Sequence, residues 1–260
     1  GLFLASRQHA SASVNFDGDA YGDKELKVAT LNKLKQTLRN SMNKSPELAL
    51  AYFQLAVSDA LGFDVSSGDG GLDGSIAFEN APSSLVGAVK ALRGVQEELT
   101  ATNAISFADV SAFGGAEALE TVGSARITVQ LGRADAKKAN AKPPSFDIWG
   151  DSSEAPISKA KEVFTSAGLN AKEIAALLCA HGEMKNILTP ILAKANAAKT
   201  EVNDEDDSED DEDKDFVPSS FGRRDMIYGA KLSSSFSNAY VKNLLAAVKK
   251  TAPSEIRLSL

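Results

Sequence analysis

Apolar side chains recur every three or four residues through almost all of the longer segments of this chain. Leu31, Leu34 and Leu38 show this spacing between Lys24 and Arg39. Such spacing puts apolar groups on one face of a helix. The same pattern predicts helices over 48–61, 85–99, 106–121, 155–167, 170–181, 187–198 and 236–248. Only 126–131 reads as a short extended stretch, and no strand pair is convincing. The sequence therefore predicts an all-α fold.

Helix starts are marked by capping residues. These are Ser45 before Pro46 and Glu47, Ser106 with Asp109, and Asn170 with Glu173. Gly114 and Gly115 lie inside one predicted helix, where each glycine costs about 1 kcal/mol relative to alanine. We therefore expect these glycines to allow a close crossing of two helix backbones.

The formal net charge of −7 comes from one short segment. Between Glu201 and Asp215 lie 11 acidic residues and one lysine, which leaves 24 acidic against 27 basic residues elsewhere. Like charges repel, so 201–218 is predicted to be a disordered, solvated insert. The remaining predicted units are an N-terminal arm at 1–22, a helical core at 23–200, and a C-terminal helix and tail at 219–260 that complete the core.

The composition argues against two classes of protein, those that span a membrane and those that bind nucleic acid. No apolar run approaches the roughly 20 residues that cross a bilayer, which predicts no transmembrane segment. The basic residues are not interleaved with aromatic ones, which argues against a nucleic-acid partner. Residues 1–12 include Ala10-Ser11-Ala12, a small-residue pattern of the kind that signal peptidases cut. We interpret this segment as an ordered arm, with a targeting remnant as the alternative.

Five segments resemble, in the same order, elements of the plant-type haem peroxidases. They are Gly70–Glu79 (GGLDGSIAFE), Ile105–Ala116 (ISFADVSAFGGA), Leu131–Asp135 (LGRAD), Glu173–His181 (EIAALLCAH) and Phe236–Tyr240 (FSNAY). The resemblance implies a haem-peroxidase-like helical fold. In that family the fourth element ends in the histidine that ligates the haem iron, so it implies His181 as an axial ligand.

The helix before the glycine-rich loop departs from the family. Where the family has a distal arginine, an aromatic residue and a distal histidine, this chain has Gln54, Val57 and Ser58. Cleavage of peroxide needs a base to move a proton and a cation to stabilise the leaving hydroxide. Losing a general base costs about 10²–10⁴-fold in rate, and losing an electrostatic stabiliser about 10²–10³-fold. We therefore predict no catalytic residues and a non-catalytic protein.

The proximal side leaves two interpretations open. His181 is either a buried core histidine or a ligand of haem b, and we favour the first. The aspartate that orients the ligand in the family is replaced by Ser237, which weakens that support. Gly182 stands where a hydroxyl residue often helps to bind a cation, so no metal is expected. The sole tryptophan, Trp149, lies upstream of His181, and we expect it to be a surface or interface anchor. A haem pocket, if kept, is expected to be empty or degenerate.

Within the superfamily, the chain most resembles the thylakoid lumen ascorbate-peroxidase-like group. The stretch Phe53–Asp64 (FQLAVSDALGFD) and the tail Pro253–Leu260 (PSEIRLSL) carry this resemblance. It implies a chloroplast protein of the thylakoid lumen, peripheral to the membrane. Its expected partners are core or extrinsic subunits of a photosystem on the lumenal side, with photosystem II favoured over photosystem I. Docking through the basic helix 24–39 or through the tail is the expected contact. A haem peroxidase with a non-standard distal site is the alternative.

Overall fold

The computed structural model describes residues 24–78, 82–100, 105–140, 155–202 and 257–258. The N-terminal arm, Trp149, Ser237 and most of the acidic insert and the C-terminal helix lie outside the described residues. The elements are α2 (Lys24–Lys44), α3 (Glu47–Ala60), η1 (Ser75–Ala77), η2 (Ser83–Leu85), α4 (Val86–Thr100), α5 (Phe107–Thr121), β1 (Ala155–Pro156), α6 (Ile157–Ser166), α7 (Ala171–Val202) and β2 (Arg257–Leu258). The predicted all-α fold is confirmed. The departures among the described residues are a two-residue antiparallel pair, β1 with β2, and an isolated bridge between Asp64 and Asp69.

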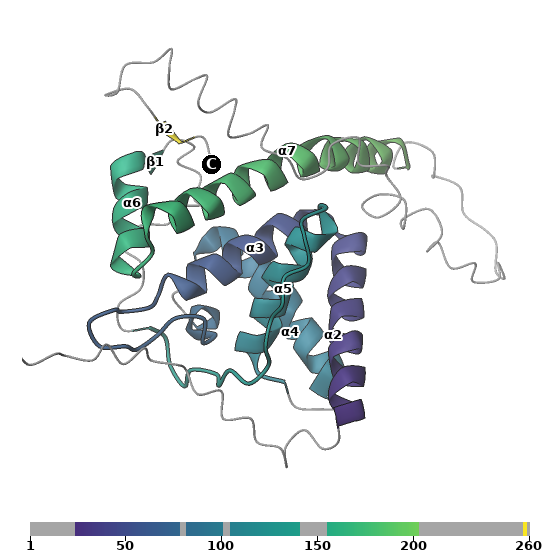
Figure 1. Cartoon of the computed structure of the whole chain (residues 1–260). Helices are drawn as coiled ribbons and strands as arrows, with labels where there is room; N and C mark the ends of the chain where they lie inside the picture. The colour runs from purple at the N-terminus through teal and green to yellow at the C-terminus, as the bar shows by residue number, and fades with distance from the viewer. Residues whose placement is uncertain (1–23, 79–81, 101–104, 141–154, 203–256, 259–260) are drawn as a thin grey trace, which may run out of the picture.

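Helices α3 and α5 form the centre of the molecule and make its most extensive helix–helix contact. Figure 1 shows α2 on one side of them, α4 behind and α7 passing across α3. Both central helices are apolar on nearly every face, as expected for helices enclosed by others. Tyr52, Leu55, Phe107 and Val110 are completely buried.

The glycine pair in α5 allows the close crossing predicted from the sequence. A Cβ atom on Gly115 would lie 2.7 Å from the Cβ of Ala56 in α3. A Cβ atom on Gly114 would lie 3.2 Å from a methyl group of Leu92 in α4. Neither contact fits an added methyl group without movement, so these glycines set the separation of α5 from both neighbours.

Two basic residues of α2 pair with a buried carboxylate of α5. Lys35 Nζ lies 2.7 Å and Arg39 Nε 2.6 Å from the carboxylate of Glu117, whose side chain is fully buried in α5. The exposed positions include the uncharged Asn32 and Gln36. The helix therefore uses these two cations to neutralise a buried carboxylate.

The ends of several helices differ from the sequence expectation. Residues 170–198 were predicted as two helices, but α7 continues without a break through Pro190 to Val202. The segment around 181–188 stays helical because Met184, Ile187 and Leu188 pack into the core. At the start of α3, no side-chain cap forms, and Ser45 accepts instead through its backbone carbonyl from Leu48.

Candidate functional site

The three positions that replace the distal residues of the family lie on α3. Gln54 is partly buried and faces α7, whereas Val57 and Ser58 are buried at 8% exposure each. Neither a base nor a cation is present among these three side chains. The three positions therefore lie together on α3, two of them in the buried interior.

Gln54 makes direct contact with His181, the residue that matches the axial ligand. The Gln54 side-chain nitrogen lies 2.9 Å from Nε2 of His181, which joins α3 to α7. An amide NH₂ group donates and cannot accept, so Nε2 of His181 accepts this hydrogen bond. The imidazole is then neutral, with its proton on Nδ1. The lone pair that would bind a haem iron is thus already in use.

Burial keeps His181 in this neutral form. The side chain is 1% exposed, and the Phe53 ring lies 6.3 Å away, centroid to centroid. Burial first, and the charge of Lys185 second, lower the pKa of His181 from 6.5 to about 4. Protonation at Nε2 would also point an N–H group at the Gln54 amide. His181 is therefore a neutral hydrogen-bond acceptor near neutral pH.

Asp59, the residue after Ser58, has a structural role that the sequence did not reveal. Its carboxylate accepts the backbone N–H groups of Gly74 at 2.7 Å and Ile76 at 3.0 Å. Burial raises the pKa of Asp59 to about 6, and the two backbone hydrogen bonds partly oppose this shift. The carboxylate therefore fixes the glycine-rich loop to α3.

Two family-like segments hold each other through further carboxylates. Asp135 accepts the backbone N–H groups of Phe107 and Ala108 at 2.9 and 2.8 Å, at the start of α5. In return, Asp109 accepts from the backbone of Gly132 and from the Arg133 side chain. The predicted cap of α5 is confirmed, since Ser106 Oγ accepts from the Asp109 backbone. The Asp109 carboxylate, however, accepts from Gly132 and Arg133, so the second half of the predicted capping box does not form.

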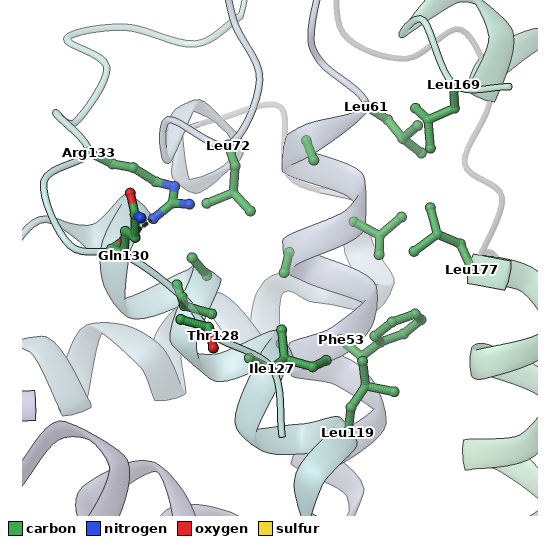
Figure 2. Close-up of a pocket in the computed structure, with 17 residues that line it drawn as sticks. Phe53, Leu61, Leu72, Leu119, Ile127, Thr128, Gln130, Arg133, Leu169 and Leu177 are labelled. Carbon is green, nitrogen blue, oxygen red and sulfur yellow. Dashed lines mark hydrogen bonds between the residues drawn. The ribbon is translucent and has the colours of Figure 1, made fainter. Parts of the chain in front are cut away.

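A groove of about 490 Å³ opens beside the distal positions. Its floor consists of small residues of α3 and α5, including Ala56, Ala60 and Ala116. Figure 2 shows Leu169 and Leu177 on one side of α3, and Gln130 and Arg133 on the other. The lining is mostly apolar. Sequence reasoning missed this groove, although the run of small residues on two crossing helices could have indicated it.

The peroxidase family profile matches residues 34–258. This match spans most of the chain, so the chain belongs to the peroxidase family, a class that normally binds haem.

Curated relatives extend the likeness to particular proteins. The probable L-ascorbate peroxidase 8, chloroplastic, of Oryza sativa subsp. japonica is 32% identical over 117 residues, which are 43% of this chain and 24% of the relative. The putative L-ascorbate peroxidase 6 of Arabidopsis thaliana is 29% identical over 136 residues, which are 51% of this chain and 40% of the relative. The matches thus cover well under half the length of these relatives.

A solved structure supports the same fold. The crystal structure of the TL29 protein from Arabidopsis thaliana superposes with a TM-score of 0.50 at 24% identity, covering 60% of this chain and 73% of that chain. At this level of identity the likeness shows the fold alone.

The described residues do not fit a haem held by His181 in this conformation. A porphyrin would have to lie between His181 and the α3 side chains, yet the Gln54 and His181 nitrogens are 2.9 Å apart. No atom fits between two groups at hydrogen-bond distance. In the described part of the chain, no three His, Cys, Asp or Glu side chains gather as a metal site either. None of the described helices has the length and apolar character of a membrane span.

Proposed function

We propose that this chain is a non-catalytic peroxidase-family protein that acts as a structural or accessory subunit of a photosystem, on the lumenal side of the thylakoid membrane. Photosystem II is the proposed partner. The single observation that carries the non-catalytic part is the hydrogen bond between Gln54 and His181. This hydrogen bond occupies the His181 nitrogen that would ligate iron. Its donor, Gln54, stands where the family has its distal arginine.

The proposed location and partner have separate support. The curated relatives from Oryza sativa are named chloroplastic, which favours a chloroplast protein. The resemblance of 53–64 and of the tail to the thylakoid lumen group favours the lumen and photosystem II. A protein without turnover in this setting would act through the contacts that it makes.

Haem titration of the purified full chain tests the non-catalytic part. We expect no Soret band that depends on His181, and no peroxide consumption with ascorbate above that of free haem. His181→Ala serves as the matched control, because it removes the candidate ligand. A Soret band that the wild type shows and His181→Ala lacks would contradict the proposal.

Binding to isolated complexes tests the partner. A tagged full chain is mixed with detergent-solubilised photosystem II and, separately, photosystem I, and each mixture is separated on a native gel. We expect co-migration with photosystem II. Co-migration with neither complex would rule out the accessory role.

The second candidate is a haem peroxidase with a non-standard distal site. One observation favours it, since His181 keeps the position of the family's axial ligand. This function requires Gln54 to leave His181, so that haem b could enter between α3 and α7. Gln54→Gly would then strengthen a haem spectrum that His181→Ala abolishes, whereas the non-catalytic proposal expects no such band in the wild type.

A further inference from the structure

The groove beside α3 is separate from the position that a haem would take. Gln54 and His181 close the gap between α3 and α7 by direct contact, and neither of them lines the groove. The groove instead runs across α3, with Leu177 of α7 on one side and Gln130 on the other (Figure 2). It is therefore a second hollow with its own lining.

The hollow is a consequence of the close crossing of α3 and α5. Ala56 meets Gly115 at the crossing, and both residues lie on the groove floor. Ala60 and Ala116 continue this floor with single methyl groups, whereas larger apolar side chains such as Leu177 surround it. Apolar surface that remains open to water in this way favours an apolar group that covers it.

The size of the groove suits a small molecule better than a protein. Its volume of about 490 Å³ lies within the range of about 300–1,000 Å³ that is typical of small-molecule sites. A stable protein interface buries about 800 Å² on each partner. The apolar rim does not widen into such a face, because Arg126, Lys172 and Glu173, next to it in sequence, are charged and exposed.

One end of the groove carries hydrogen-bond donors. The Arg133 guanidinium lies there, close to Gln130 and Leu72 (Figure 2). Its Nη1 donates to the Asp109 carboxylate at 3.1 Å and to the Gln130 carbonyl at 2.7 Å. A guanidinium has N–H donors on each of its nitrogens, and Nε and Nη2 of Arg133 donate to no group in the described part of the chain. These two nitrogens can donate to an oxygen of a ligand.

The charge of the lining selects an uncharged ligand. Arg133 is the one charged side chain among the described residues that line the groove, and the Asp109 carboxylate pairs with it. An anion would compete with Asp109 for the same guanidinium, and a cation would be repelled by it. A neutral oxygen accepts a hydrogen bond without disturbing this pair.

We propose that this groove binds a small, uncharged, apolar molecule with a carbonyl or hydroxyl oxygen at one end. The oxygen accepts from Arg133, and the apolar body covers Ala60 and Ala116 and extends toward Leu177. This binding is a further activity of the chain, and it depends neither on haem nor on the proposed role at a photosystem.

An environment-sensitive dye tests whether the groove binds such a molecule. Prodan is an uncharged naphthalene with a ketone at one end, and its emission shifts to the blue in apolar surroundings. We expect saturable binding of prodan to the purified full chain, with blue-shifted emission. No saturable binding up to the solubility limit of the dye would overturn the proposal.

Three competitors test the chemistry of the ligand by displacement of prodan. Acetylnaphthalene and ethylnaphthalene differ only in a carbonyl against a methylene group, and naphthoate carries a carboxylate. We expect acetylnaphthalene to bind at least about threefold more tightly than ethylnaphthalene, because its oxygen accepts from Arg133. Naphthoate should bind at least about tenfold more weakly than acetylnaphthalene. Equal or tighter binding of either ethylnaphthalene or naphthoate would contradict the proposed ligand class.

Matched variants localise the site. Ala60→Leu fills the groove floor, and Ala29→Leu makes the same change at an exposed position of α2 outside the groove. We expect Ala60→Leu to weaken prodan binding at least about tenfold and Ala29→Leu to leave it unchanged, with circular dichroism confirming that both variants fold. Equal binding by the two variants would place the dye elsewhere and overturn the proposal.

A change at the polar end tests the role of Arg133. Arg133→Met removes the donors, so the preference for acetylnaphthalene over ethylnaphthalene should disappear, and a preference that persists would overturn the assignment. If circular dichroism shows that this variant does not fold, the comparison of the two competitors in the wild type decides.

A second copy of the chain is the other occupant that the experiment must recognise. Size-exclusion chromatography compares the wild type with Ala60→Leu. We expect the same elution volume for both, since a small molecule occupies the groove. A wild-type dimer that Ala60→Leu converts to a monomer would make the groove a subunit contact and overturn the proposal.

Discussion

One pair of side chains, Gln54 and His181, decides how the proposed haem site is interpreted. A buried imidazole with a lowered pKa is stable when a neighbour donates to its free nitrogen, and Gln54 supplies that donor. An arginine at the same position would put a cation against a neutral ring. The glutamine is therefore compatible with a closed gap between α3 and α7.

Removal of the Gln54 donor should destabilise the fold. Gln54→Leu leaves the His181 acceptor buried beside an apolar group, which costs about 1–3 kcal/mol of unfolding free energy. Gln36→Leu makes the same chemical change at an exposed position of α2 and should lie within about 0.5 kcal/mol of wild type. Urea denaturation of both variants measures the difference. Equal stability of the two variants would show that the hydrogen bond contributes nothing.

The pH dependence of stability should report His181. Its pKa falls from 6.5 to about 4 on folding, so its contribution is fully present above pH 6.5 and is lost as pH falls through 4. The difference in unfolding free energy between wild type and His181→Gln should therefore shrink over this window, by up to about 3 kcal/mol. Asp59 titrates in both proteins, so its opposite contribution cancels. A difference that stays constant with pH would contradict a buried neutral imidazole.

At the scale of elements, separations between helices are set by small residues and by carboxylates. Gly115 admits the close approach of α3, and Asp59 ties the glycine-rich loop back onto α3. Glu117 joins α5 to α2 through Lys35 and Arg39. Each of these contacts can be changed at one or two positions.

Addition of a methyl group at the α3–α5 crossing should push the helices apart. Gly115→Ala is expected to cost about 1–3 kcal/mol, because its Cβ would meet Ala56 at 2.7 Å. The double variant Gly115→Ala, Ala56→Gly should recover part of this loss. Gly87→Ala in α4, where an added Cβ meets nothing within 4 Å, should stabilise by up to about 1 kcal/mol. Thermal unfolding compares all three, and a harmless Gly115→Ala would mean that the crossing is looser than described.

Removal of both cations that face Glu117 should leave a buried, uncompensated carboxylate. Replacement of Lys35 and Arg39 together by methionine is expected to cost about 3 kcal/mol or more in chemical denaturation at pH 7. Lys44→Met, at an exposed position at the end of α2, is the control and should have little effect. If the double variant is as stable as the control, Glu117 is not held by these two residues.

At the scale of the whole molecule, the acidic insert determines the sign of the net charge. It is not predicted to form part of the core. Deletion of 204–215 removes 10 acidic residues and one lysine, which changes the formal charge from −7 to +2. We expect the shortened chain to bind a cation exchanger at pH 7 and to unfold at the same urea concentration as wild type. An earlier unfolding midpoint would show that the insert contributes to folding.

The sequence predicted the helices because helix formation depends on local pattern. Ser106 and Asn170 cap helices, and Gly115 allows a crossing, as their neighbours in sequence indicated. Contacts between distant residues were not predictable in this way. Gln54 and His181 are 127 positions apart, and nothing in either local sequence shows that the two meet. The continuity of α7 through Pro190 likewise depends on packing against other elements.

The segments 106–109 and 132–135 hold each other through hydrogen bonds, and this bears on how sequences of this kind are assigned to a family. There, Asp109, Arg133 and Asp135 hold one stretch of backbone against another. These residues are therefore required for folding whether or not a chain of this kind is catalytic. A family profile built on such residues therefore reports a shared fold. Catalytic activity has to be judged separately, from the side chains at the α3 positions.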